Sequence, residues 1–592
     1  MLKIGAISPH IKLANPSYNA DIIIKSAKKA KSAGCNIALF SKFPITGSSI
    51  FNEKAGGSLM NSSLITDESL KAFNKILKAS ENIKDLVLVL SLPTEINGRL
   101  SVCNKVILNG EVIGENIGSD LEFSFAGIEY VVSQKSPKKL QSLYKSKVIL
   151  LQNEVAYTAG IRDIEKIKAK YKYKNNIFIS VSTGPEESGD DCLYSGLKCF
   201  AVDGCLIDSV INLKNDLSIF KIAESYNKTL SFYNREIDSA MNLCNIDEYF
   251  DVKNPFIPVD YYMLENYCLD ILRIQALSIG KRLEHINSKD LVLGVSGGLD
   301  STLALVASVL AFDYKGWDKN RIHCITMPGF GTGNLTKTNA FKLTSALGLD
   351  LKEIPIEPIV TSHLESINQP RLENGDFKID ITYENAQARM RTLILMDYSN
   401  KVNGIVLGTG DMSELALGWC TYNGDHMSMY SINSGVPKTL ISHILNTYLK
   451  RVVDSDKLTD LSYILQSIID TPISPELLPT DKNGNIAQLT EDSVGPYALH
   501  DFFLFTLICK GLSPLDTYKK AILIFENDFD KYEIKKWLKT FIWRFFSQQF
   551  KRSCLPLGPK VLKFSLSPRA GFCMPSDADC SIWLSNLDSG DF

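Results

Sequence analysis

The stretch from Leu291 to Leu310, LVLGVSGGLDSTLALVASVL, constrains the fold of this chain more than any other. Its first five residues form a short apolar run with β-branched side chains, which predicts a buried strand. Gly297 and Gly298 follow as a tight turn, and the apolar residues after them cover more than one helical face, which predicts a largely buried helix. A strand, a glycine turn and a helix N-terminus together place backbone N–H groups and the positive end of a helix dipole around a bound anion.

The polar residues of this turn suit a bound phosphate. Ser296 and Ser301 add hydroxyl donors. Asp300 brings a carboxylate beside the phosphates, where the two would repel each other unless a cation lay between them, and this predicts Mg²⁺. No Lys follows the glycines, so the turn is not a GxxxxGK[ST] loop. The alternative is an ordinary strand-to-helix turn that is rich in small residues.

Length and composition limit the number of domains and the kinds of partner that this chain can have. The chain has 592 residues, too many for one hydrophobic core, so two or three domains are expected. A net charge of −2 gives no basic excess for nucleic acid, and the longest apolar runs are too short to cross a membrane. We expect the cytoplasm, because no export segment opens the sequence. The 13 Cys include no CxxC pair, so neither a disulfide framework nor a zinc site is indicated.

The alternation of elements predicts two α/β domains. Over residues 1–245 short strands alternate with helices, and Asn109-Gly110 marks a hairpin. Residues 246–260 are rich in Pro and Asx, and we interpret them as a linker. Over residues 261–592 strands such as HCITMPG and GIVLGTG alternate with helices, which predicts a doubly wound parallel sheet followed by a helical and then irregular tail.

Three motifs of the second domain directly follow expected strands. They are SGGLDS (296–301), MPGFGTG (327–333) and LGTGDMSE (407–414). Ligands of doubly wound sheets bind beyond the carboxyl ends of the strands. We therefore expect all three motifs to meet at one rim of the sheet.

Together these motifs resemble NAD⁺ synthetase in its long form, which fuses a nitrilase-like glutaminase domain to an ATP-pyrophosphatase domain. The resemblance covers nearly the whole chain and is carried by GVSGGLDS (294–301), MPGFGTG (327–333), YENAQARMRT (383–392), the run 407–441 and QFKRSCLPLGPKV (549–561). Other pyrophosphate-loop enzymes, among them GMP synthetase, asparagine synthetase and tRNA-modifying ligases, share only the first motif. The resemblance implies an αββα sandwich before a Rossmann-like sheet.

The implied reaction is the amidation of nicotinic acid adenine dinucleotide, or deamido-NAD. A carboxylate is a poor electrophile, so ATP first joins AMP to it and releases pyrophosphate. Ammonia then attacks the acyl-adenylate and gives NAD⁺ and AMP. No side-chain nucleophile is required, so catalysis depends on positioning and charge neutralisation. The family forms homo-oligomers, so the resemblance implies one here.

The resemblance also implies a role for each matching residue. Asp300 and Glu414 match the Mg²⁺ ligands, and Arg391 and Lys438 are cations near phosphate or carboxylate that complete a catalytic set with Asp300. The residues implied to bind ATP are Gly294, Val295, Ser296, Gly297, Gly298, Leu299, Asp300, Ser301 and Thr409. Those implied to bind deamido-NAD are Asn385, Glu414, Trp419, Cys420, Thr421, Tyr422 and Lys551. The alternatives are core packing for Trp419 and a solvated surface position for the two lysines.

The first domain departs from the family pattern at the amidase triad. Glutamine hydrolysis of this kind uses a Cys nucleophile, a Glu base and a Lys that stabilises the oxyanion. Lys42 stands where the family's Glu falls, and the loop that carries the family's Lys after the Asn104 hairpin is missing. Val132 or Ser133 takes the position of the Cys, and no Cys occurs in 104–191. A Ser nucleophile is conceivable there, but without the Glu base its hydroxyl would be unactivated.

We therefore expect a degenerate amidase domain and an enzyme that uses free ammonia or ammonia from a separate donor. The alternative is a glutamine-dependent synthetase whose triad lies elsewhere. Two further alternatives are a scaffold protein with two inactive halves and a ligase that acts on tRNA. The intact SGGLDS and LGTGDMSE motifs oppose the scaffold, and the near-neutral charge opposes the tRNA ligase. Neither nucleic acid nor a membrane is expected as a partner.

Overall fold

The computed structural model of this protein describes most of the chain, namely residues 2–50, 62–96, 99–134, 147–162, 176–189, 191–203, 205–211, 216–222, 246–331, 334–451, 458–471 and 494–589. The chain divides into two compact units. Unit 1 consists of Met1–Tyr157, Ile161–Gly189 and Leu193–Ile246, and unit 2 of Thr158–Gly160, Asp190–Cys192 and Asp247–Phe592.

Unit 1 is built on two six-stranded sheets. The first has the order β12-β1-β2-β3-β4-β5, and the second has the order β11-β10-β9-β8-β7-β6. The first contains β1 (Leu2–Ile7), β2 (Ile37–Phe40), β3 (Val87–Ile96), β4 (Arg99–Leu108), β5 (Glu111–Ile117) and β12 (Leu217–Ile222). The second contains β6 (Leu121–Phe125), β7 (Ile128–Ser133), β8 (Val148–Asn153), β9 (Ile177–Ser182), β10 (Lys198–Val202) and β11 (Cys205–Val210). The central strands of each sheet run parallel, and hairpins extend both sheets.

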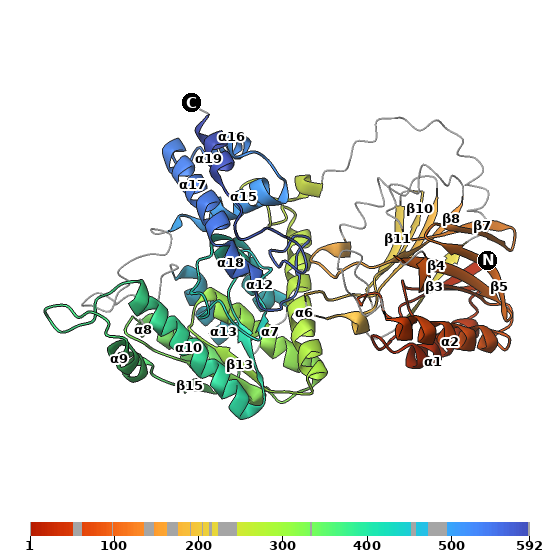
Figure 1. The fold of residues 1–592 in the computed structure, drawn as a ribbon, viewed down its shortest axis with the longest axis horizontal. Helices are drawn as coiled ribbons and strands as arrows, with labels where there is room; N and C mark the ends of the chain where they lie inside the picture. The colour runs from red at the N-terminus through yellow and green to blue at the C-terminus, as the bar shows by residue number, and fades with distance from the viewer. Residues whose placement is uncertain are drawn as a thin grey trace. The chain divides into compact units, whose positions relative to one another are not determined.

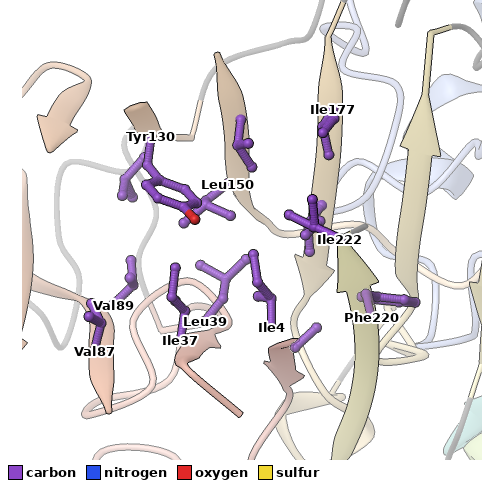
Figure 2. Packing of buried hydrophobic residues seen from close by; sticks show 14 of the residues in the cluster. Ile4, Ile37, Leu39, Val87, Val89, Tyr130, Leu150, Ile177, Phe220 and Ile222 are labelled. Carbon is purple, nitrogen blue, oxygen red and sulfur yellow. The ribbon is translucent and has the colours of Figure 1, made fainter. Parts of the chain in front are cut away.

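The main core of unit 1 lies between the two sheets. Figure 2 shows Ile37, Leu39 and Val89 of the first sheet pointing toward Tyr130 and Leu150 of the second. All five side chains are fully buried. Apolar side chains from both inner faces therefore fill the space between the layers, as in other sheet-on-sheet packings.

Two helices cover the outer face of the first sheet. They are α1 (Pro16–Ser32) and α2 (Ser63–Ser80), which lie side by side in Figure 1. Ala38 and Phe40 of β2 point toward these helices, while their neighbours in the strand point into the core between the sheets. The strand is buried on both faces, and this explains why its sequence, IALF, is continuously apolar.

Unit 2 contains a five-stranded parallel sheet of order β15-β14-β13-β16-β17. The strands are β13 (Leu291–Gly294), β14 (Ile322–Thr326), β15 (Leu351–Glu353), β16 (Ile405–Gly408) and β17 (Tyr430–Ser431). The order runs outward from β13 in both directions, which confirms the predicted doubly wound sheet. The strand order reverses between β13 and β16, and the crevice beyond such a switch point is where ligands bind in these folds.

Helices pack on this sheet and extend beyond it. The helices are α6 (Tyr261–His285), α7 (Leu299–Lys315), α8 (Asn334–Ala346), α9 (Glu357–Ser366), α10 (Ile381–Val402), α11 (Met412–Leu417), α12 (Lys438–Arg451), α13 (Leu458–Asp470), α15 (Tyr497–Phe503), α16 (Pro514–Ile524), α17 (Lys531–Ser547), α18 (Gln549–Ser553) and α19 (Ser581–Asp588). Val292 of β13 packs with residues of α9 and α10, and α7 packs against α6 and α12. Figure 1 shows α16, α17 and α19 together in blue. Within the described residues, no helix is both long and apolar enough to span a bilayer.

Candidate active site

The predicted strand, glycine turn and helix are present at the switch point. The turn joins β13 to α7, and Gly298 is the N-cap residue of that helix. Gly297 has a φ of 91°, and a Cβ on it would lie 2.2 Å from the Thr336 carbonyl oxygen, so only glycine fits there. The Ser296 hydroxyl accepts a hydrogen bond from the Gly298 N–H at 3.2 Å and lies 3.2 Å from the Ser301 hydroxyl. Backbone donors and two hydroxyl groups therefore gather at one helix N-terminus.

Next to this turn, three carboxylates surround one ammonium group. Lys438 Nζ lies 2.7 Å from Asp300 Oδ2, 2.8 Å from Asp411 Oδ2 and 2.8 Å from Glu414 Oε1. One oxygen from each of the three acids lies within 4.8 Å of the others. The Lys438 side chain is only 4% exposed, so it is not a solvated surface lysine.

The N-terminal ends of three helices present these side chains. Asp300 belongs to the first turn of α7, and Lys438 is the first residue of α12. Asp411 is the N-cap of α11, where its Oδ1 accepts the N–H groups of Ser413 and Glu414 at 2.7 and 2.9 Å. Because capping uses only one carboxylate oxygen, the other can face Lys438. Sequence analysis missed Asp411, although an acid three residues before Glu is a known pattern for the start of a helix.

The charges of the cluster fit a divalent cation. Burial and the neighbouring Asp411 raise the pKa of Asp300 to about 6, although Lys438 opposes this rise, and burial likewise raises the pKa of Glu414. Burial alone would lower the pKa of Lys438, but the three carboxylates together raise it well above its usual value. With all three acids ionised, three negative charges and one positive charge sum to −2. Asp300 Oδ1 is buried and accepts no hydrogen bond in the described part of the chain. Hard oxygen ligands of this kind suit Mg²⁺.

A buried asparagine joins the two sides of the switch point. Asn433 Nδ2 donates to the Asp300 carbonyl oxygen at 2.9 Å and to the Thr409 carbonyl oxygen at 3.0 Å. Its own Oδ1 accepts a hydrogen bond from Gln275 Nε2 at 2.9 Å. Asn433 therefore fixes the loop after β16, which carries the predicted Thr409, against the start of α7. No sequence pattern singled out this residue.

Some of the residues predicted to bind deamido-NAD come together beside α10. The Thr421 hydroxyl donates to Asn385 Oδ1 at 2.7 Å. Tyr422 is 44% exposed as a residue, and its ring stacks on the His426 ring at a centroid distance of 5.3 Å and contacts the Phe550 ring at 5.5 Å. An exposed aromatic ring held by two others is a preorganised platform for a flat ligand group.

Other predicted residues are engaged with the protein itself. Lys551 Nζ donates to the carbonyl oxygens of Gly418 and Cys420 at 2.8 and 2.7 Å, so it holds the loop after α11 in place. Trp419 in that loop lies below the Arg544 guanidinium, 5.2 Å from the ring centroid. Arg391 Nε donates to the carbonyl oxygen of Met327, in the loop after β14, at 3.1 Å. The remainder of MPGFGTG, Thr332 and Gly333, lies outside the described residues.

The three residues that the sequence placed at the amidase positions of unit 1 lie at or near strand ends. Lys42 follows β2, and its Nζ lies 3.6 Å from Glu154 Oε2. Ser133 ends β7, is fully buried and donates to Asp120 Oδ1 at 2.7 Å. Val132 belongs to the apolar core between the sheets. Three residues, 118–120, join β5 to β6, where the sequence predicted a missing loop.

A Cys, a Glu and a Lys do meet elsewhere in unit 1, on the hairpin of β4 and β5. Cys103 Sγ lies 3.3 Å from Glu115 Oε1, and the same oxygen lies 2.8 Å from Lys105 Nζ. These are the residue types of an amidase triad. However, Cys103 is only 2% exposed, and burial raises its pKa to about 12. A nucleophilic cysteine needs the opposite, an accessible thiol with a lowered pKa.

Residues 271–523, which contain the whole carboxylate cluster, match the family model described as NAD synthase. A glutamine-dependent NAD(+) synthetase from Mycobacterium leprae is 42% identical over 357 residues, which cover 56% of this chain and 51% of that protein. Another from Acinetobacter baylyi is 30% identical over 270 residues, which cover 46% of this chain and 44% of that protein. The chain thus spans about half the length of the curated relatives it matches.

Two solved structures share the fold of the whole chain. A crystal structure of a glutamine-dependent NAD(+) synthetase from Cytophaga hutchinsonii aligns with a TM-score of 0.71 over 99% of this chain and 100% of that one, at 16% identity. The glutamine-dependent NAD+ synthetase from Acinetobacter baumannii in complex with ADP aligns with a TM-score of 0.62 over 96% and 98%, at 19% identity. The predicted fold class, a nitrilase-like sandwich followed by a Rossmann-like domain, is therefore confirmed.

Proposed function

We propose that this chain is an NAD⁺ synthetase, which uses ATP to amidate deamido-NAD and releases AMP and pyrophosphate. The observation that carries the proposal is the cluster of Asp300, Asp411, Glu414 and Lys438 directly beside the glycine turn. The family match of the surrounding residues supports the same conclusion. A catalyst that activates a carboxylate with ATP needs a phosphate cradle and countercharges for the leaving pyrophosphate, and this rim offers both.

In this proposal, the chain's own residues bind and orient the nucleotide. The turn from Ser296 to Ser301 donates backbone and hydroxyl hydrogen bonds to phosphate oxygens. Asp300, Asp411 and Glu414 would hold Mg²⁺, which supplies positive charge to the departing pyrophosphate. Lys438 keeps the three acids together and adds a cation beside the phosphates. No side chain needs to act as a nucleophile, so the rate depends on how closely these groups fix the reacting atoms.

In this proposal, the dinucleotide substrate binds to the group of residues beside α10 that contains Asn385, Thr421 and Tyr422. The exposed face of the Tyr422 ring suits stacking on a base or on the pyridine ring. Asn385 and Thr421, joined by their hydrogen bond, offer polar groups beside it. Lys551 supports this loop through the two carbonyl oxygens that it binds, and Arg391 is a cation near the end of β14. The domain assignment of 1–245, 246–260 and 261–592 remains part of the proposal.

The source of nitrogen has two candidates. The relatives are named glutamine-dependent, which favours glutamine for this chain. Free ammonia is favoured by the residues at the amidase positions, where Lys42 and Ser133 are engaged with acids and Val132 is buried in the core. The names of the relatives give glutamine the stronger support, and ammonia, with or without a separate donor, is the second candidate.

One experiment separates these candidates and tests the activity itself. The purified chain is supplied with ATP, Mg²⁺ and deamido-NAD, and with either ammonium or glutamine. We expect NAD⁺ to form with ammonium in either case, because ammonia is the attacking species in both. NAD⁺ formation with glutamine at a comparable rate would establish a working glutaminase. If ammonium gave no NAD⁺, the proposed function would be wrong.

The remaining assignments follow from the proposed activity. ATP, deamido-NAD and ammonia are the small-molecule partners, and neither nucleic acid nor a membrane is among them. A homo-oligomer and a cytoplasmic location stay predictions from the sequence.

A further inference from the structure

Helix α15 presents two side chains, one turn apart, to the beginning of α12. They are Tyr497 and Asp501, which lie four residues apart and therefore on the same face of the helix. Both are almost completely buried. The facing end of α12 begins with Lys438, the ammonium of the carboxylate cluster.

Asp501 binds two of the three helices that carry the cluster, α11 and α12. Its Oδ1 accepts the hydroxyl of Ser413 on α11, and its Oδ2 accepts the Thr439 hydroxyl at 2.7 Å and the Thr439 N–H at 3.2 Å. The Ser413 hydroxyl in turn accepts the Lys438 N–H at 2.8 Å. The N–H groups of the first turn of a helix have no partners within that helix, so a buried carboxylate is an effective cap for them. One side chain thus joins the start of α12 to α11, which bears Glu414.

Tyr497 contacts the ammonium group of the same lysine, Lys438. The Lys438 Nζ lies 5.4 Å from the centroid of the Tyr497 ring, within the range of a cation–π contact. Asp501 therefore fixes the backbone of Lys438, and the Tyr497 ring limits the positions open to its ammonium group. Together with the three acids, these contacts leave the long side chain little freedom.

We propose that Asp501 is a positioning residue for the adenylation site, which sets the place of Lys438 relative to Glu414 with Tyr497 as its second contact. This inference rests on the proposed function. Asp501 touches none of the cluster's charged groups, so it acts through Ser413 and Thr439. Removing it would leave the charge of the cluster unchanged but would loosen the start of α12, and an error of about 1 Å in such a site costs on the order of 100-fold in rate.

The test compares variants that differ only in whether they touch Asp501. Thr439→Val removes the hydroxyl that binds Asp501, whereas Thr447→Val removes a hydroxyl further along the same helix, which donates to the His443 carbonyl oxygen and interacts with Cys268. Asp501→Asn keeps the shape of the side chain and removes its charge. Its control is Asp530→Asn, which likewise removes the charge of a capping carboxylate, here at the N-terminus of α17, where Asp530 Oδ1 accepts the N–H groups of Tyr532 and Glu533. If Asp501→Asn folds poorly, the comparison of Thr439→Val with Thr447→Val still tests the proposal.

Two readouts are measured for each variant. The first is the steady-state rate of pyrophosphate release, for which we expect kcat to fall roughly 10- to 100-fold in Asp501→Asn and several-fold in Thr439→Val, with KM for deamido-NAD nearly unchanged. The second is the rate of Lys438 acetylation by an amine-reactive reagent, followed by mass spectrometry. It should rise in both variants and stay at the wild-type level in both controls.

The two readouts keep this inference separate from the proposed function. If the wild-type chain releases no pyrophosphate, the proposed function fails, and the labelling of Lys438 still tests the positioning role. If the wild type is active but Asp501→Asn and Thr439→Val keep its kcat and leave Lys438 as protected as before, the positioning role is wrong. An equal loss of kcat in the variants and in their controls would also overturn the positioning role.

Discussion

Asp300 and Lys438 lie 138 residues apart in the sequence, and their side chains form an ion pair of 2.7 Å beyond the carboxyl end of the central strand β13. The pair connects the helix of the phosphate turn to the start of α12. It therefore links the proposed phosphate cradle with the lysine of the carboxylate cluster.

Asp411→Asn tests the third carboxylate of the cluster. The asparagine oxygen can still accept the two N–H groups that Oδ1 caps, so α11 should form normally, but one negative charge is lost. We expect affinity for Mn²⁺, used as a paramagnetic substitute for Mg²⁺, to fall at least roughly 10-fold, together with a lower kcat. Electron paramagnetic resonance of free Mn²⁺ measures the first effect.

The control for Asp411→Asn is Asp380→Asn, which changes the N-cap of α10, where Asp380 Oδ1 accepts the N–H groups of Thr382 and Tyr383. This residue is not part of the cluster. Equal Mn²⁺ binding by both variants and the wild type would exclude Asp411 as a ligand.

Lys551→Met tests whether this lysine supports the substrate loop or binds substrate directly. The methionine leaves two carbonyl oxygens, of Gly418 and Cys420, without their donor. Loss of these bonds should lower stability by about 1–3 kcal/mol and raise KM for deamido-NAD more than it lowers kcat. Substrate kinetics and chemical denaturation measure the two effects. A raised KM with unchanged stability would instead indicate direct contact with the substrate.

His500 should make the protein sensitive to acid. The ring is buried, its Nε2 lies 2.6 Å from the Val494 carbonyl oxygen, and burial lowers its pKa to about 4. In the unfolded chain His500 binds a proton near the ordinary pKa of about 6.5, whereas in the folded chain it does so only near pH 4. The free energy of unfolding therefore keeps its full value above about pH 6.5 and decreases as the pH falls from there toward 4. The loss amounts to ~3 kcal/mol over this window. Urea denaturation of wild type and His500→Gln from pH 4 to 8 should show a shallower pH dependence for the variant, and identical slopes would contradict the assignment.

Cys103→Ser tests the only alternative arrangement of amidase residue types found in the described part of unit 1. Because the thiol is buried and its pKa is raised, we expect any NAD⁺ formation from glutamine to be unchanged in this variant. The rate with ammonium serves as the internal control for folding. A selective loss of the glutamine rate would show that Cys103 is a nucleophile and that the hairpin opens to expose it.

Local sequence patterns predicted the parallel sheet of unit 2, and the family resemblance predicted the two-sheet sandwich of unit 1 and part of the site. The run from Leu291 to Leu310 has its strand, turn and helix because its apolar spacing and glycines are local signals. Asp300, Glu414 and Lys438 meet as the matching motifs implied, since all of them follow strands or begin helices at one rim. The two-residue strand Tyr430–Ser431 carries too few residues to show an alternating pattern.

The contributions that the sequence could not reveal come from contacts between distant elements. Asn433 and Asp501 lie outside the predicted roles, because nothing in their local sequence shows that they bridge loops or helices. Lys551 was predicted to bind substrate, whereas its ammonium group binds two carbonyl oxygens of the protein. The direction of a long side chain depends on tertiary packing, so a motif that places the residue does not fix its partner.

The products of ATP cleavage test the central claim most directly. The purified chain is given ATP, Mg²⁺, ammonium and deamido-NAD, and nucleotides and phosphates are separated by chromatography. We expect AMP, pyrophosphate and NAD⁺ in equal amounts from the wild type, and none of the three from a folded Asp300→Ala variant. Formation of ADP and phosphate, or full activity of Asp300→Ala, would contradict this claim.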